Sequence, residues 1–175
     1  MDTETIEKYL DFYSKTQGLL PEKLEEYREK FQENGFLAQQ DLYELAYESS
    51  TRSAHHVRKN SEERCRQVTS NLFKVKDDFS QIALIEALKG FKAPTASVVL
   101  TVKNPDRHAV VDTRVWASLE RLGYLEGRKE SFTADDYVKM MEPIREIAED
   151  TGFSTGKVGY ALFAMDVDKR EGTLH

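Results

Sequence analysis

The residue best placed to do chemistry in this sequence is Asp112. It follows the apolar pair Val110-Val111 and opens a predicted helix through Trp116 and Leu119. An aspartate at a helix N-terminus caps backbone N–H groups, a role worth about 1 kcal/mol, and capping alone would explain it. A fixed, ionised carboxylate can also stabilise positive charge or deprotonate a water molecule. Because a helix dipole and its N–H donors lower a carboxylate pKa, we expect Asp112 to stay ionised.

A predicted helical hairpin precedes Asp112. Its residues Ile85, Leu88, Gly90, Phe91, Ala96 and Leu100 follow the order h-x-x-h-x-G-h-x-x-x-x-A-x-x-x-h, where h is apolar. Gly90 supplies the positive φ of a sharp helix-ending turn, and Pro94 suits the first turn of the next helix. Free N–H groups at such a helix start suit a phosphate, and Lys89 and Lys92 flank the turn. The alternative is an ordinary pair of helices with two surface lysines.

Charge is unevenly distributed along the chain. The net charge is −6, but residues 49–103 carry 10 Lys/Arg against 5 Asp/Glu, whereas residues 1–48 carry 5 against 12. Because affinity for phosphates follows the local field, the basic middle segment is compatible with a nucleic-acid partner. Chance clustering on solvated helices explains the same numbers.

Length and composition indicate one soluble globular domain over residues 1–175. The 175 residues are 39% hydrophobic and 32% charged, and no run of about 18 apolar residues predicts a membrane span. The N-terminus MDTETIEKYL has no apolar signal core, so we expect a cytoplasmic protein. The single Cys65 excludes an internal disulfide and a four-cysteine cluster, and the four histidines have no metal-binding spacing. We therefore expect no metal ion and no cofactor.

Apolar spacing predicts helices almost throughout, so the fold class is all-α. The segments are 3–16, 21–35, a helix capped by Asp41, a turn at 54–59, one from Ser61, one capped by Asp77 or Asp78, 93–102, 112–122, 134–150 and 154–170. Pro143 should kink or split the helix over 134–150. ASVVLTV and HAVVD look like strands locally, but tertiary packing overrides such preferences.

The stretch GFKAPTASVVLTVKNPDRHAVVDTRVW resembles the core of the helix-hairpin-helix–GPD superfamily of DNA glycosylases. In that family a hairpin (here about 78–103) is followed by an apolar helix, a Gly/Pro loop and a catalytic aspartate, which falls on Asp112, 18 residues after Pro94. LYELAYESSTRSAHHVRKN is similar to the upstream helix pair of the 8-oxoguanine-glycosylase-like branch. The resemblance implies a compact two-lobed helical fold, and DNA-backbone contacts from Lys89, Gly90, Phe91, Lys92, Ala93 and Pro94.

The sequence departs from the family at the nucleophile. Bifunctional members carry a lysine near the start of the second hairpin helix, where this chain has Pro94. Lys92, two residues earlier, is an alternative nucleophile, although a phosphate-facing lysine is the more ordinary interpretation. The resemblance therefore implies a monofunctional glycosylase without a strand-cutting lyase step.

Other residues are candidates for base flipping. Ser50, Thr51 and Arg52 lie where the family inserts a residue into the DNA, although a turn with a surface arginine explains them equally well. His55 and His56 adjoin this break. Trp116, Tyr160 and Phe163 could line a pocket, but aromatic residues at helical spacing are usually core. Ser154-Thr155-Gly156-Lys157 is either a helix cap or a second phosphate site.

Together these features predict a monomeric, nucleoid-associated DNA N-glycosylase of base excision repair. It would bind double-stranded DNA, flip out a damaged or modified base and hydrolyse its N-glycosidic bond, with Asp112 stabilising the oxocarbenium-like sugar and activating water. The alternative is a noncatalytic DNA- or protein-binding module on the same scaffold. The sequence does not identify the base.

Overall fold

A computed structural model describes residues 1–16 and 20–170 of the chain. The described residues form helices joined by loops and turns, with no strand. The helices are α1 (Thr3–Thr16), α2 (Leu20–Asn34), α3 (Gln39–Ser49), α4 (Thr51–Ala54), the 3-10 helix η1 (Val57–Lys59), α5 (Glu62–Asn71), α6 (Asp78–Glu86), α7 (Ala93–Lys103), α8 (Thr113–Arg121), α9 (Ala134–Thr151) and α10 (Thr155–Arg170). The all-α prediction is confirmed.

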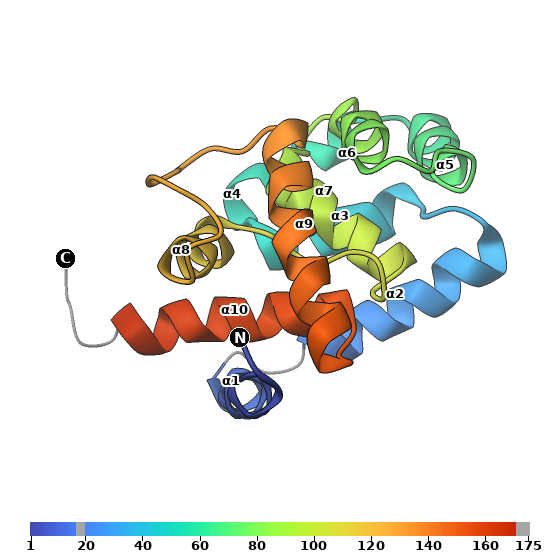
Figure 1. Cartoon of the computed structure of the whole chain (residues 1–175). Coiled ribbons are helices and arrows are strands. Elements are labelled where there is room, and N and C mark those ends of the chain that lie inside the picture. Colours follow the sequence, from blue (N-terminus) through green and yellow to red (C-terminus); the bar gives the residue numbers. More distant parts are fainter. Residues whose placement is uncertain (17–19, 171–175) are drawn as a thin grey trace.

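Helix α7 is the centre of the fold (Figure 1). It packs against α2, α3, α6 and α9, and every residue from Thr95 to Val102 is buried. A helix that is apolar on all sides is stable only when neighbours cover every face. This explains why ASVVLTV, which resembles a strand locally, is helical: the surrounding helices bury its β-branched side chains whichever way they point.

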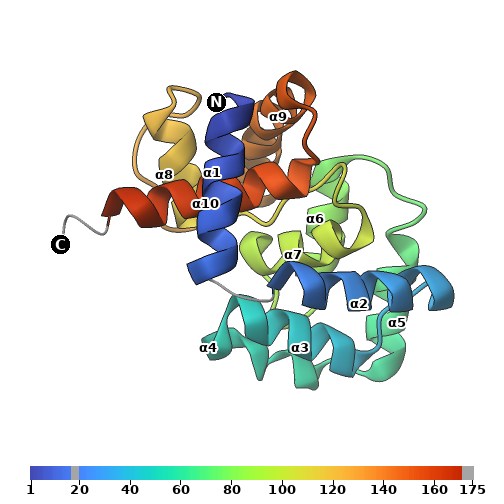
Figure 2. The ribbon, with the colours of Figure 1, turned by 90° about the horizontal axis from the view of Figure 1, so that it is seen from below.

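Two groups of helices flank α7 (Figure 2). On one side α1 and α8 pack against α10, which also contacts α9. On the other side α3 contacts α2, α4, α5 and η1. The buried residues of α1 are Ile6, Tyr9 and Tyr13, and those of α3 are Leu42, Leu45 and Ala46. None of the described helices is both long and apolar enough to cross a membrane.

The structure corrects the predicted cap at Asp41 and excludes the predicted split at Pro143. Asp41 is not the N-cap of α3; Ala38 is. Asp41 is the third residue of the helix, and its Oδ2 accepts a hydrogen bond from the Ala38 N–H at 3.1 Å. Pro143 does not split α9, which is continuous from Ala134 to Thr151. Pro143 is buried, so packing of α9 against α6, α7 and α10 compensates for the hydrogen bond that a proline lacks.

Candidate active site

A cavity of about 510 Å³ brings together four of the ten residues to which the sequence assigned chemistry, namely Ser50, Lys92, Pro94 and Asp112. Its walls come from both helix groups and from α7. The lining residues are Tyr13, Glu48, Ser49, Ser50, Ser53, Lys92, Pro94, Thr95, Val98, Val110, Val111, Asp112, Val115, Gly159, Tyr160 and Phe163. Its volume lies within the range of roughly 300–1,000 Å³ that is typical of small-molecule pockets.

Asp112 is the N-cap of α8, as predicted. Its backbone is extended, with φ −156° and ψ −169°, and its Oδ1 accepts the N–H groups of Arg114 and Val115, both at 2.9 Å. These two bonds fix the carboxylate at the start of the helix. Capping therefore does occur, and it leaves the carboxylate on the cavity wall.

The expected lowering of the Asp112 pKa is wrong. Burial raises the pKa of Asp112 by more than the hydrogen bonds from Val115 and Arg114 and the Arg114 guanidinium lower it, and the nearby Asp166 carboxylate raises it further. The hydrogen bonds at the helix N-terminus do lower the pKa of Asp112, but the loss of solvation on burial raises it by more. A carboxylate with a raised pKa is a stronger base towards water once it is ionised.

Ser97 and Gly159 hold the segment before Asp112 beside α7 and α10. The buried Ser97 hydroxyl accepts the Val111 N–H at 3.0 Å and donates to the Pro94 carbonyl at 2.5 Å. A Cβ at Gly159 would lie 2.7 Å from the Ala109 Cβ, so only glycine allows α10 this close. These contacts place Asp112 and the start of α7 on one cavity.

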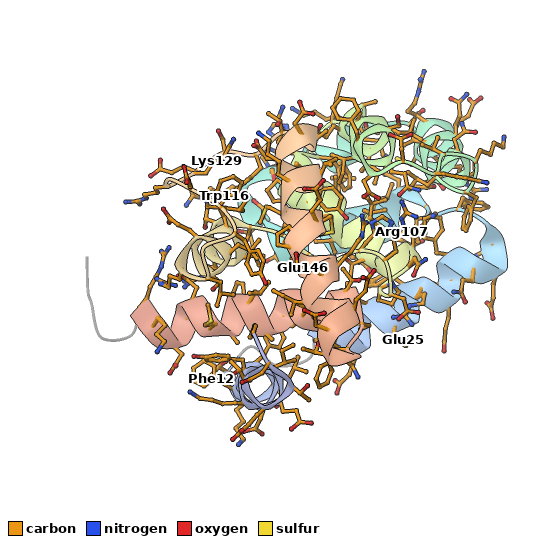
Figure 3. All side chains as sticks on the ribbon, in the orientation of Figure 1. Phe12, Glu25, Arg107, Trp116, Lys129 and Glu146 are labelled. Atoms are coloured by element: carbon orange, nitrogen blue, oxygen red, sulfur yellow. The ribbon has the colours of Figure 1, made fainter. Side chains whose placement is uncertain are left out.

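Aromatic rings form one wall of the cavity. The ring centroids of Tyr13 and Tyr160 are 5.0 Å apart, and those of Tyr13 and Phe163 are 5.8 Å apart. Tyr160 and Phe163 thus lie at the cavity, whereas Trp116 does not: its indole donates to the Gly127 carbonyl at 2.7 Å. Lys129 lies over the Trp116 ring at 5.4 Å, and Figure 3 labels both beside α8.

Tyr13 was not foreseen as a site residue. It comes from α1, which packs on α10, and a buried tyrosine at helical spacing gave only a core signal. Burial, with the Asp112 charge as a second cause, raises the pKa of Tyr13 to about 12. Its hydroxyl therefore stays protonated at neutral pH and can donate a hydrogen bond.

The predicted hairpin spans α6 and α7. Gly90 has φ +92°, the positive value that the turn was expected to need. Lys89 and Lys92 are exposed, and the N–H groups of Gly90 and Lys92 have no acceptor among the described residues. Phe91 and Ala93 are buried, which leaves only their backbones available to a partner. Pro94 and Lys92 line the cavity.

Asn60 fixes this turn, although no local pattern in the sequence indicated such a role. Its amide nitrogen donates to the Lys89 carbonyl at 2.9 Å and to the Val57 carbonyl at 2.8 Å. Its amide oxygen accepts the Lys89 N–H, also at 2.9 Å. The Lys89 N–H is consequently engaged within the protein, so of this residue only the side chain remains free to meet a phosphate.

The break after α3 lies at the cavity. Ser50 separates α3 from α4 in an extended conformation, with φ −157°, and lines the cavity. Thr51 and Arg52 are exposed and do not line it. His55 and His56 have ring centroids 3.9 Å apart. The proximity of His55, and to a smaller degree burial, lowers the pKa of His56.

The basic segment 49–103 is nearly free of ion pairs. Of its ten lysines and arginines, only Arg66 pairs with a carboxylate, Glu62 at 2.7 Å, within residues 1–16 and 20–170. Elsewhere arginines share carboxylates: Arg114, Arg121 and Arg170 all pair with the buried Asp166. Most of the positive charges of residues 49–103 therefore have no carboxylate in direct contact among the described residues.

The start of α10 is occupied by the protein itself. The Gly156 N–H donates to the Pro105 carbonyl at 2.8 Å, and the Thr155 hydroxyl donates to the Asp106 carbonyl at 2.6 Å. The Ser154 hydroxyl accepts the Lys157 N–H at 3.4 Å, as a cap does. These bonds favour the capping interpretation of Ser154-Thr155-Gly156-Lys157 over a second phosphate site.

The described residues contain no group of three His, Cys, Asp or Glu side chains that could hold a metal ion. Comparison with protein-family models, curated proteins and solved structures finds no match to this chain.

Proposed function

We propose that this protein is a DNA N-glycosylase that binds double-stranded DNA, flips a damaged or modified base into the cavity and releases it by hydrolysis. The observation that carries the proposal is the convergence of Asp112, the start of α7 and an aromatic wall on one cavity of about 510 Å³. In this proposal α6, the turn at Gly90 and α7 act as a helix-hairpin-helix motif of a two-lobed glycosylase-like fold.

DNA binding is supported by the turn before α7. A phosphate there would meet the N–H groups of Gly90 and Lys92, the positive end of the α7 dipole, and two exposed lysines, Lys89 and Lys92. The surrounding basic side chains are nearly free of internal ion pairs, so they would exchange counterions for phosphates. Such binding weakens steeply as salt concentration rises.

Base release is supported by Asp112. Cleavage of an N-glycosidic bond builds positive charge on the deoxyribose, and a carboxylate at the cavity wall stabilises that charge. The raised pKa makes the ionised carboxylate a better acceptor for a proton of the attacking water. The hydrogen bonds from Arg114 and Val115 occupy Oδ1, which leaves Oδ2 for the water.

Strand cleavage by a lysine nucleophile is a weaker candidate. Pro94 stands at the position of the nucleophile in the family that the sequence resembles. Lys92 does share the cavity with Asp112, so a Schiff base at Lys92 has a direct test in borohydride trapping. We expect no trapped adduct; an adduct that disappears in Lys92→Ala would make the enzyme bifunctional.

The test is base release from a panel of duplexes that carry oxidised, alkylated, mismatched or deaminated bases. Wild-type protein and Asp112→Asn are compared with and without hot alkali, which cleaves abasic sites. We expect alkali-dependent cleavage by the wild type and at least about a 100-fold slower reaction by Asp112→Asn, with DNA binding retained. Retained binding without release of any base would instead favour the noncatalytic DNA-binding module. Salt-insensitive or absent DNA binding would favour a protein partner.

A further inference from the structure

The surface of α4 and η1 (residues 51–59) carries basic side chains and histidines but no acid. Residues 49–61 contain neither Asp nor Glu. The charged and titratable side chains of the segment are Arg52, His55, His56, Arg58 and Lys59. All of them are exposed except His56, which is half-buried. Both elements pack against α3, and Figure 2 shows α4 at the end of that helix.

The carboxylates of the neighbouring helices do not neutralise this surface. The three acids of α3 and the first acid of α5 have partners of their own, namely Lys30 for Asp41, Tyr27 for Glu44, Lys23 for Glu48 and Arg66 for Glu62. The Arg58 guanidinium carbon lies 3.9 Å from the Tyr43 ring centroid. This contact orients the arginine and leaves its charge available to a partner.

The surface of α4 and η1 is fixed to the hairpin turn. A Cβ at Gly90 would lie 2.9 Å from the Val57 backbone nitrogen, so the two segments touch backbone to backbone. The Asn60 side chain also binds both the N–H and the carbonyl of Lys89, at 2.9 Å. The two segments therefore form one rigid unit, to which the hairpin adds the exposed Lys89 and Lys92.

His55 and His56 form a pair of imidazole rings on this surface. Their ring centroids are 3.9 Å apart, and two protonated rings at that distance repel each other. The pKa of His56 is lowered first by His55, then by burial and by Lys59, and no carboxylate opposes these effects. A phosphate would supply the negative charge that the pair lacks, and so would favour its protonation.

We propose that the surface of α4 and η1 is a second contact for the DNA backbone, beside the hairpin, and that the His55–His56 pair takes up a proton when a phosphate binds there. This inference rests on the DNA binding of the proposed function and adds its regulation by pH. Proton uptake and phosphate binding are linked, so each strengthens the other by the same factor. DNA affinity therefore increases as pH falls through the range in which histidines titrate, about 7.5 to 5.5.

The experiment measures binding of an undamaged duplex, so base release plays no part in it. Fluorescence anisotropy with a pH-insensitive dye gives Kd at pH 7.5 and 5.5, on either side of the ordinary histidine pKa of about 6.5, at constant ionic strength. The wild type is compared with the double variant His55→Gln/His56→Gln. His108 is fully buried with a pKa lowered to about 3, so it stays neutral over this range. His175 is present in both proteins and lies outside the described residues.

We expect the wild-type Kd to fall by about 3- to 10-fold from pH 7.5 to 5.5, within the limit of about tenfold per pH unit for one proton. The Kd of the double variant should change by less than about twofold. Calorimetric titrations in two buffers of different ionisation enthalpy count the protons directly. They should show uptake of about 0.5 to 1 proton per complex near pH 6.5 for the wild type and none for the double variant.

A pair of lysine variants tests the contact with the DNA backbone. Lys59→Gln should weaken binding and reduce the slope of log Kd against log salt concentration by about one. Lys139→Gln removes the same charge from an exposed position on α9 and should leave both quantities unchanged. Equal effects of the two substitutions would mean that only the net charge matters, which contradicts a contact at α4 and η1.

The inference is overturned by a wild-type Kd that does not depend on pH, by zero proton uptake, or by equal pH dependence in the double variant. Circular dichroism at both pH values confirms that the two proteins are folded. Base release from damaged duplexes with pH-independent binding would leave the glycosylase intact and reject the histidine contact. Proton-linked binding without release of any base would support the contact and reject the glycosylase. Absence of DNA binding at every pH overturns both.

Discussion

Asn60 offers the sharpest test of how the hairpin is held. Its side chain makes three hydrogen bonds, to the N–H and carbonyl of Lys89 and to the carbonyl of Val57, at 2.8 to 2.9 Å. Asn60 is 9% exposed, so water replaces these bonds poorly. Asn60→Ala removes all three and leaves the Lys89 groups without their partner.

The cost follows from these contacts. A net contribution of about 1 kcal/mol for each hydrogen bond gives a loss of about 3 kcal/mol. In a domain of this size, 1 kcal/mol corresponds to roughly 2–4 °C in Tm, so we expect Tm to fall by about 6–12 °C. Because Lys89 and Gly90 belong to the same turn, DNA affinity at temperatures well below Tm should fall too.

The assay is thermal unfolding followed by circular dichroism, together with a DNA-binding titration at 20 °C. Asn71→Ala is the matched control, because no side-chain hydrogen bond of Asn71 occurs within the described residues and its Tm should change by less than about 2 °C. If Asn60→Ala unfolds at the wild-type temperature, the turn is held by something other than Asn60. If its Tm falls but DNA affinity stays, the turn does not contact DNA.

Four further outcomes are expected. Asp112→Ala should lower stability by about 1 kcal/mol in urea unfolding through loss of the cap, whereas Asp112→Asn, an equally good cap, should keep stability and lose only activity; equal activity of Asp112→Asn and wild type would leave Asp112 as a cap alone. Because a general base works ionised and burial raises the pKa of Asp112, the acid limb of the pH–rate profile should lie above the value of about 3.9 for an exposed aspartate; a limb at or below that value would contradict the desolvation argument. His108 is fully buried and its pKa is lowered to about 3, so the unfolded chain binds one proton more between that pH and about 6.5, and stability should fall as pH drops by up to about 1.4 kcal/mol per unit; urea unfolding at pH 7 and 5 should show a smaller difference in His108→Asn. Gly90→Ala should cost at least about 2 kcal/mol in the same assay, because φ is +92° and a Cβ would lie 2.9 Å from the Val57 backbone nitrogen; a neutral substitution would mean that the turn relaxes freely.

Local signals in the sequence were sufficient for several helix caps and turns, although the helical state of ASVVLTV depended on packing. The cap at Asp112 and the positive φ of Gly90 each depend on a few neighbouring residues. Helix caps and turns are stabilised by groups three or four positions apart, so their patterns are legible without the fold. Helices α6 and α7 begin at Asp78 and Ala93, where the predicted cap and Pro94 indicated helix starts, for the same reason.

The tertiary structure decided which side chains meet. Tyr13 and Asp112 are 99 positions apart in the sequence and line one cavity because α1 packs on α10, and no local pattern distinguishes a tyrosine at a cavity from one in the core. No local pattern indicated that Trp116 lies outside the cavity, where its indole N–H donates to the Gly127 carbonyl. The direction of the Asp112 pKa shift also depended on the fold. The sequence predicts the helix N-terminus, which lowers the pKa, but the burial that raises it comes from residues that only tertiary packing brings near Asp112.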